Sequence, residues 1–334
     1  MATSDMTTDI MALNATIAQE NQVTQKLMTE INKVVVGQKE MVEGILMGLM
    51  TGGHILLEGV PGLAKTLTIS TVANAISLHF QRIQFTPDLL PTDLIGTMIF
   101  NPKTAEFTPR KGPVFANIVL ADEINRAPAK VQSALLESMA ERQVTIGETS
   151  YRLPDPFLVL ATQNPLEQEG TYSLPEAQMD RFLFKINVSY PNKSDEMEIL
   201  NRMGQNSKPK VEPVWSLEDL ARITKLVDQI YVDQKIKNYI VDIVMASRNP
   251  KEYGLSRVAH LIQVGASPRA TLSMFRAAKA HAFLRSRGYV TTDDVKAVIF
   301  NVLRHRLILT FEADAESITT DQLVKEILSE VEVS

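Results

Sequence analysis

The chain has 334 residues, of which 45% are hydrophobic and 22% charged, as is typical of a globular protein that fills a core in two or three domains. Its formal net charge of -5 argues against a protein that mainly holds nucleic acid or an anionic membrane, and the lack of cysteine excludes disulfides and thiolate metal sites. No apolar run approaches the roughly 18 residues of a membrane span, and the first residues lack a leader pattern, so we expect a cytoplasmic protein without a membrane span.

The first half of the chain alternates helical segments with short apolar strands. After about twelve polar residues that we expect to be frayed, apolar positions recur at helical spacing over residues 13–36 and 41–50. Unalternating apolar runs, typical of strands covered on both faces, follow at 55–57, 83–85, 118–120, 157–161 and 182–186. Helical segments lie between them, notably at 67–78 and 129–141. This alternation predicts a parallel sheet between helices.

The pattern changes after Pro191, because from there to the C-terminus the apolar spacing is helical. The expected helices cover residues 195–203, 217–229, 234–247, 268–285 and 293–305. We therefore predict an α/β domain over residues 1–190 and an all-helical domain over residues 191–334. Within the first domain, a hairpin that pairs residues 144–146 with 151–153 is expected before the strand at 157–161.

The segment GVPGLAKT lies between an apolar strand and a helix, and it approximates the phosphate-binding pattern G-x-x-x-x-G-K-[ST]. Backbone N–H groups of such a loop bind phosphate, while Lys65 can reach the β- and γ-phosphates and Thr66 can ligate Mg²⁺. Ala64 stands where the pattern has its second glycine, immediately before the lysine, and alanine is unstrained there only if its φ is negative. The alternative is an ordinary glycine turn before an exposed lysine. The predicted nucleotide-binding residues are Gly59, Val60, Pro61, Gly62, Leu63, Ala64, Lys65 and Thr66.

Polar residues follow two further apolar strands. Asp122 and Glu123 come after the strand at 118–120, where the first carboxylate can hold Mg²⁺ through its water and the second can polarise a water for attack on the γ-phosphate. Asn164 follows the strand at 157–161 and is a candidate for orienting that water. Paired acids are also common in loops, and an asparagine before proline often forms a turn. The functional interpretation of the three residues therefore depends on their order behind the phosphate loop.

The five segments GVPGLAKT, VLADEINR, ATQNP, LPEAQMDRF and GASPRA follow one another along the chain. In this order and spacing they resemble the MoxR family of AAA+ ATPases, and the resemblance extends from about Val35 to about Leu309. The family itself tolerates alanine at the position of Ala64. The resemblance implies an α/β P-loop NTPase domain, followed by an all-helical lid domain.

By this resemblance Asn164 corresponds to sensor 1 and Arg269 to sensor 2. Ser267 as N-cap and Pro268 in the first turn would place Arg269 at the start of a helix, although a capped surface helix would show the same pattern. Arg181 resembles the arginine finger, whose guanidinium spreads positive charge over the transferring phosphoryl oxygens.

An arginine finger acts on the nucleotide of a neighbouring subunit, so the resemblance implies a homo-oligomeric ring, expected to be a hexamer. Arg126 and Arg142 are further candidates for such a role in trans. The alternative for Arg181 is a local ion pair with Asp180 or Glu176, which the spacing also permits.

Two insertions in the first domain resemble those of the AAA+ clade to which the MoxR family belongs. Residues 97–113 resemble the helix-2 insert and residues 143–156 the pre-sensor 1 hairpin, which would line the pore or a face of the ring. Ordinary surface loops would show the same pattern. The implied function is a chaperone-like remodeller that hydrolyses ATP with Mg²⁺, and the family suggests partners with von Willebrand factor A domains. The alternatives are an assembly switch without turnover and a DNA-linked motor, the latter disfavoured by the net acidity.

Overall fold

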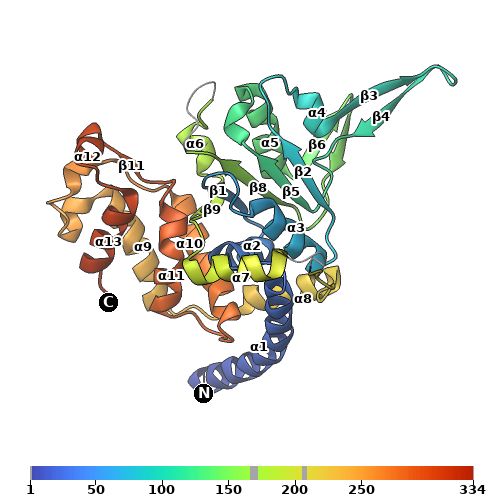
Figure 1. Cartoon of the computed structure of the whole chain (residues 1–334). Helices are drawn as coiled ribbons and strands as arrows, with labels where there is room; N and C mark the ends of the chain where they lie inside the picture. The colour runs from blue at the N-terminus through green and yellow to red at the C-terminus, as the bar shows by residue number, and fades with distance from the viewer. Residues whose placement is uncertain (1, 166–171, 205–208, 334) are drawn as a thin grey trace. The chain divides into compact units, whose positions relative to one another are not determined.

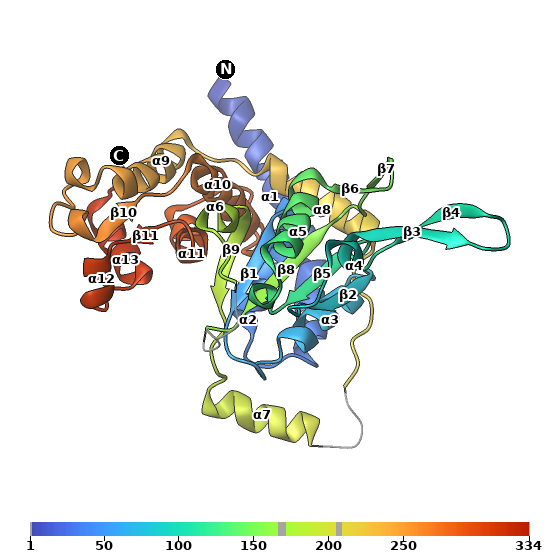
Figure 2. The same cartoon turned by 90° about the horizontal axis from the view of Figure 1, so that it is seen from above.

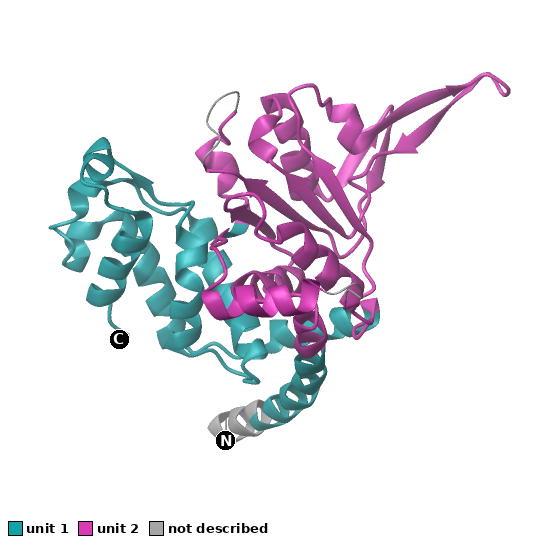
Figure 3. Ribbon diagram, viewed as in Figure 1, with its two compact units in different colours: residues 1–26, 183–185, 218–334 teal, residues 27–182, 186–217 magenta. Residues whose placement is uncertain are grey.

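The computed structural model of the chain describes residues 2–165, 172–204 and 209–333. The chain forms two compact units (Figure 3). Unit 1 consists of Met1–Lys26, Leu183–Lys185 and Glu218–Ser334, and unit 2 consists of Leu27–Phe182 and Ile186–Leu217. Within the described residues, none of the helices combines the length and the apolar character that a bilayer span requires.

Unit 2 is built on a five-stranded sheet in the order β2-β5-β8-β1-β9 (Figure 1). The pairs β2–β5, β5–β8 and β8–β1 are parallel. The central strands are buried almost throughout, as their unalternating apolar sequences predict. The predicted parallel α/β architecture is therefore confirmed. The strands are β1 (His54–Glu58), β2 (Phe80–Gln84), β5 (Ile118–Asp122), β8 (Leu158–Gln163) and β9 (Phe182–Asn187).

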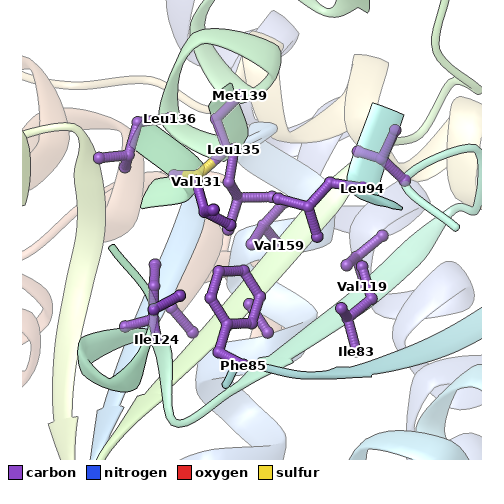
Figure 4. Packing of buried hydrophobic residues seen from close by; sticks show 14 of the residues in the cluster. Ile83, Phe85, Leu94, Val119, Ile124, Val131, Leu135, Leu136, Met139 and Val159 are labelled. Atoms are coloured by element: carbon purple, nitrogen blue, oxygen red, sulfur yellow. The ribbon is translucent and has the colours of Figure 1, made fainter. Parts of the chain in front are cut away.

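Helices of unit 2 pack on this sheet and hold its strands in place. In the core that Figure 4 shows, Leu135 of α5 and Leu94 of α4 are fully buried. Val119 of β5, Val159 of β8 and Phe85, which follows β2, are buried in the same cluster. This packing fixes β5 and β8 against α5, and with them the positions at which the two strands end. The helices of unit 2 are α2 (Lys39–Thr51), α3 (Lys65–Ala75), α4 (Pro91–Ile95), α5 (Ala129–Glu141), α6 (Glu176–Met179) and α7 (Lys193–Met203), of which α7 has no buried residue.

The end of α3 is tied to the segment that precedes α8. The N–H groups of Val214 and Trp215 both donate to the carbonyl oxygen of Ala75, at 2.8 and 3.2 Å. Trp215 is the one tryptophan of the chain and is 1% exposed. The helix that begins in the glycine-rich loop is thus held at its far end by a buried aromatic residue.

Two antiparallel hairpins extend unit 2. β3 (Gly96–Asn101) pairs with β4 (Glu106–Lys111), and Figures 1 and 2 show this hairpin projecting away from the sheet. Phe100 and Phe107 face each other across it, with ring centroids 5.3 Å apart. β6 (Gln143–Ile146) pairs with β7 (Thr149–Arg152), so the expected hairpin is present. Its first strand begins one residue earlier than expected, and its second strand covers residues 149–152 instead of 151–153.

Unit 1 is mainly helical; besides the residues Leu183–Lys185 of β9 it contains the short antiparallel pair β10 (Ile262–Val264) and β11 (Ile308–Leu309). The division of the chain at residues 190 and 191 stays a prediction. Strands of three and two residues are too short to show an alternating pattern, which is why the sequence did not reveal them. The helices are α8 (Leu217–Gln229), α9 (Gln234–Arg248), α10 (Pro268–Leu284), α11 (Thr292–Leu303), α12 (Phe311–Ala315) and α13 (Thr320–Glu330).

The N-terminal helix α1 (Ala2–Asn32) also contributes to unit 1. Asn21 donates to the carbonyl oxygen of Phe283 at 2.9 Å, and Asn14 accepts from the N–H of Gly288 at 2.6 Å. The expectation that about twelve N-terminal residues are frayed is wrong, because α1 already begins at Ala2. Those residues include neither glycine nor proline, so nothing in them stops a helix that tertiary packing has already nucleated.

A buried carboxylate organises the loop between α10 and α11. Asp294 is 0% exposed and accepts hydrogen bonds from Nδ1 of His281 at 2.6 Å and from both terminal nitrogens of Arg287 at 2.7 and 2.6 Å. It also accepts from the N–H of Thr291 at 2.8 Å, which caps α11. Burial alone would raise the pKa of Asp294, but the hydrogen bonds from His281 and Arg287 outweigh it and hold this pKa well below its ordinary value.

We expect Asp294→Asn to lower the free energy of unfolding by about 3 kcal/mol at neutral pH, because it leaves the partly buried Arg287 without its carboxylate. The folded-state pKa of Asp294 is depressed, so its contribution is complete above the ordinary value of 3.8 and is lost as the pH falls below it. Urea unfolding at pH 7 and pH 3 measures both effects. Asp293→Asn, on the same turn, is the control, and an equal loss in the two variants would contradict the role of Asp294.

Candidate nucleotide site

A cavity of about 360 Å³ opens in unit 2 where β1, β5 and β8 end. It brings together five residues predicted from three separate motifs: Lys65, Thr66, Asp122, Glu123 and Asn164. Because parallel strands end at the same edge of a sheet, the strand order places these motifs side by side. The full lining consists of Gly59, Pro61, Gly62, Leu63, Ala64, Lys65, Thr66, Leu67, Arg82, Asp122, Glu123, Thr162 and Asn164, so Val60 is the one predicted loop residue outside it.

The glycine-rich loop enters the cavity in conformations that favour small residues. Gly62 has φ +87°, and a Cβ atom on Gly59 would lie 2.6 Å from the carbonyl oxygen of Val188. α3 begins at Lys65, so the loop ends at a helix N-terminus, where backbone N–H groups and the helix dipole favour an anion. Ala64 has φ 54° and ψ 22°, so the condition for an unstrained alanine is not met. A left-handed alanine costs about 1–2 kcal/mol, which the surrounding fold has to offset.

Lys65 turns back onto its own loop, where Nζ donates to the carbonyl oxygen of Gly59 at 2.6 Å. Burial lowers the pKa of Lys65, and the carboxylates of Asp122 and Glu123 oppose this decrease. Phosphate oxygens in the cavity would add negative charge beside the ammonium group and raise its pKa again. The site therefore presents a partly desolvated cation that an anion would stabilise.

Thr162 on β8 connects the two acidic residues. Its hydroxyl accepts a hydrogen bond from the N–H of Glu123 at 2.8 Å and donates one to Oδ1 of Asp122 at 2.6 Å. Glu123 has φ 58° and ψ 51°, a left-handed conformation that is sparsely populated by residues other than glycine. One buried hydroxyl thus fixes the orientation of Asp122 and holds the strained turn that directs Glu123 to the cavity.

The edge strand β2 contributes two side chains to which the sequence patterns did not point. Arg82 donates from Nε and Nη2 to Oδ2 of Asp122, at 3.0 and 2.6 Å. Gln84 accepts from Nη2 of Arg82 at 2.7 Å and donates to Oε2 of Glu123 at 2.8 Å. Arg126 adds an ion pair to the same Glu123 oxygen, at 3.1 Å. The importance of Arg82 and Gln84 depends on the register of β2 against β5, which becomes known only when the strands are paired.

The two predicted sensor residues lie in different units. Asn164 directly follows β8 in unit 2 and lines the cavity, where it is 7% exposed. Arg269 lies in unit 1, in the first turn of α10, and its N–H donates to the hydroxyl of the N-cap Ser267 at 3.1 Å. The predicted capped helix start is therefore present, whereas an action of Arg269 on the nucleotide stays a prediction.

The three arginines considered for action in trans all have partners within unit 2. Arg181 donates from Nη1 to the carbonyl oxygen of Leu136 at 2.9 Å, and Arg142 donates to that of Gly52 at 2.7 Å. Arg126 forms the ion pair with the second acidic residue described above. Arg181 and Arg142 are not among the residues that line the cavity of their own chain. Their action on a neighbouring subunit stays a prediction.

The donor set of the cavity fits Mg²⁺ together with a phosphate ligand. The Thr66 hydroxyl and the Asp122 carboxylate are oxygen ligands of the kind that Mg²⁺ prefers. Among the described residues, no group of three or more histidine, aspartate or glutamate side chains could hold a metal by itself. A magnesium ion here would need oxygen atoms from phosphate and water to complete its six ligands. Metal and nucleotide are thus expected to bind together.

Two segments of the chain match known domain families. Residues 54–184 match the ATPase family associated with various cellular activities (AAA), and residues 255–327 match the AAA lid domain. The chain is 49% identical to Chaperone MoxR1 of Mycobacterium tuberculosis over 94% of this chain and 83% of that protein. The chain belongs to the MoxR family of AAA+ ATPases. The cavity lies within the part that matches the AAA domain.

Other comparisons agree with membership of the MoxR family. Protein MoxR of Paracoccus denitrificans is 33% identical over 84% of this chain and 87% of its own length. A crystal structure described as that of a candidate ATPase from Cytophaga hutchinsonii superposes with a TM-score of 0.92. It is 50% identical to this chain and covers 98% of it, and the match spans 99% of that protein. The family and the fold class predicted from the five motifs are therefore confirmed.

We expect Thr162→Val to lower phosphate release from ATP about 100-fold, because a loss of the hydroxyl misplaces both acidic residues. It should also lower the free energy of unfolding by about 2 kcal/mol, since the N–H of Glu123 loses its partner. Steady-state turnover and urea unfolding measure these effects. Thr162→Ser keeps the hydroxyl and should retain most of the activity. A valine variant with the parental turnover would show that the bridge has no part in catalysis.

Proposed function

We propose that this MoxR-family protein binds ATP with Mg²⁺, hydrolyses it to ADP and phosphate, and uses the cycle to remodel a protein partner. The observation that supports hydrolysis is the convergence of Lys65, Asp122 and Glu123 in one cavity behind a loop suited to phosphate. These residues come from segments far apart in the sequence. Grouping them in a cavity costs solvation energy, which is expected at a functional site but not at an ordinary turn.

In this proposal the N–H groups of the loop and the ammonium group of Lys65 bind the β- and γ-phosphates and offset the charge that develops on their oxygens. Thr66 and Asp122 hold Mg²⁺, which, when bound, supplies further stabilisation of that charge. The Glu123 carboxylate accepts a proton from the attacking water, and Asn164 orients this water. The water attacks the γ-phosphate in line with the bond to the leaving ADP.

Arginines from outside the cavity complete the proposed site. Arg269, from the lid, would contact the γ-phosphate as sensor 2, and Arg181 would enter from the neighbouring subunit as the finger. The guanidinium of Arg181 is bonded to the carbonyl of Leu136, within α5, and not to a residue that lines its own cavity, which is consistent with a role outside that cavity. A finger in trans requires a closed ring, and we propose a hexamer.

The proposed partner is a protein, which the likeness to Chaperone MoxR1 supports. The two hairpins of unit 2 are candidates for contact with it, as the helix-2 insert (residues 97–113) and the pre-sensor 1 hairpin (residues 143–156). Domains of the von Willebrand factor A type are the proposed partner class. DNA is disfavoured because the chain carries a net charge of -5.

Lys65→Ala should abolish ATP binding, because it removes the cation that faces the phosphates, and Glu123→Gln should retain binding but lose turnover by at least about 100-fold. Calorimetric titration with ATP and measurement of released phosphate separate the two effects. Lys103→Ala, on the exposed β3–β4 connection, is the control for the loss of a lysine.

Parental turnover in Lys65→Ala would refute the assignment of the phosphate loop. Nucleotide binding without any turnover in the parental chain would instead favour an assembly switch. Stimulation of turnover by single-stranded or duplex DNA would favour the DNA-linked motor.

Mixing inactive Glu123→Gln with inactive Arg181→Ala subunits should restore part of the ATP turnover. Mixed rings contain some interfaces at which one subunit supplies an intact Glu123 and its neighbour an intact Arg181. Native mass spectrometry verifies that mixed rings form. If such rings stay inactive, Arg181 does not act in trans, and the same mixture made with Arg126→Ala or Arg142→Ala then identifies the finger.

A further inference from the structure

Arg82 is the cavity residue that the proposed mechanism leaves without a role. It lies on the edge strand β2, its side chain is 48% exposed, and it lines the cavity beside Asp122. Both its Nε and its Nη2 donate to the same carboxylate oxygen, Oδ2. An ion pair this exposed contributes little to the stability of a fold. The two hydrogen bonds from Arg82 to Oδ2 are therefore better explained by a role at the candidate site than by a contribution to the stability of the fold.

The two oxygens of Asp122 have different partners. Oδ1 accepts from the buried hydroxyl of Thr162, which is supplied by the neighbouring central strand. Because Oδ1 is held by the hydroxyl that also bonds Glu123, we expect a metal ion or its bound water to take Oδ2, the oxygen to which Arg82 now donates twice. A guanidinium and a hydrated Mg²⁺ carry like charge and would compete for this single oxygen.

We propose that Arg82 takes the place of the magnesium charge at Asp122 while the site lacks metal, and that it leaves Oδ2 when Mg²⁺ arrives with the nucleotide. This inference rests on the proposed function, since it concerns the same site. In this proposal Arg82 determines how much Mg²⁺ nucleotide binding requires, because a bound Mg²⁺ displaces the guanidinium of Arg82 from Oδ2.

The surroundings of Arg82 permit such an exchange. Its side chain is half exposed, so it can turn into solvent at a small cost, whereas the Asp122 side chain is only 16% exposed and stays in place. Gln84 accepts from the Nη2 of Arg82 and donates to Oε2 of Glu123. When Arg82 leaves, Gln84 loses one of these two partners, so the arrival of metal is also communicated to the residue that activates water.

The competition predicts a distinctive effect of removing the charge. Without Arg82, Oδ2 of Asp122 is open to the metal, so less Mg²⁺ is needed for nucleotide binding. Without metal, however, the Asp122 carboxylate then lies near the phosphates without its guanidinium partner and repels them. Removing Arg82 should therefore strengthen metal-assisted binding and at the same time weaken, or leave unchanged, metal-free binding. A residue that simply bound phosphate would weaken both.

The test is a titration of the full chain with ATPγS over a range of MgCl₂ concentrations, starting in EDTA. Arg82→Met keeps the length of the side chain and removes its charge, and it should reach half-maximal binding at about tenfold less Mg²⁺ than the parent. Arg82→Lys keeps the charge and should restore a requirement close to that of the parent. Lys193→Met removes a positive charge from an exposed position at the start of α7 in the same unit and should behave as the parent does.

Each other outcome overturns the inference. A parental Mg²⁺ requirement in Arg82→Met would show that Arg82 does not compete with metal, and an equal loss of binding with and without metal would identify it as a phosphate ligand. Thermal unfolding of each variant verifies that it is folded, and the half-exposed position of Arg82 makes this the expected result. A parental chain that binds no ATPγS at all would refute the proposed function as well, whereas binding that Lys65→Ala abolishes leaves only Arg82 in question.

Discussion

The parallel register of β5 and β8 is the constraint on which the candidate site depends. It sets Ala121 opposite Ala161, so the residues that follow in the two strands end beside each other at one edge of the sheet. Thr162 then lies within hydrogen-bonding distance of both Asp122 and the backbone of Glu123. A shift of this register by one residue would turn the threonine to the opposite face and separate the two acidic residues from their common partner. The helices packed on the sheet matter to the chemistry mainly because they prevent that shift.

Much of this arrangement could be predicted from the sequence, because the features concerned are local and strongly patterned. The apolar runs of β1, β5 and β8 are buried on both faces and therefore continuous in sequence, and the polar residues that end them are conspicuous for that reason. The sequence equally predicts the capped start of α10, since serine favours the N-cap position and proline the first turn of a helix. In such segments local preference and tertiary packing favour the same structure.

The features that escaped prediction depend on neighbours distant in sequence. β2 is a half-exposed edge strand with the sequence FQRIQ, so it lacks an apolar run, and the predicted strand at 83–85 covered only its end. The sequence pattern therefore does not single out Arg82, whose pairing with Asp122 follows only from the register of β2 against β5. The left-handed conformation of Ala64 is imposed by the loop against the propensity of alanine.

The position of Trp215 gives the molecule an internal optical reporter. Trp215 is the chain's one tryptophan and is buried. Its backbone N–H donates a hydrogen bond to the carbonyl oxygen of Ala75, the last residue of the helix that starts at Lys65. Ultraviolet emission from the unlabelled protein therefore comes, apart from tyrosine, from a single place at the far end of that helix. A movement of α3 that accompanies filling of the cavity would alter the surroundings of the indole, and stopped-flow fluorescence could follow it without any engineered dye.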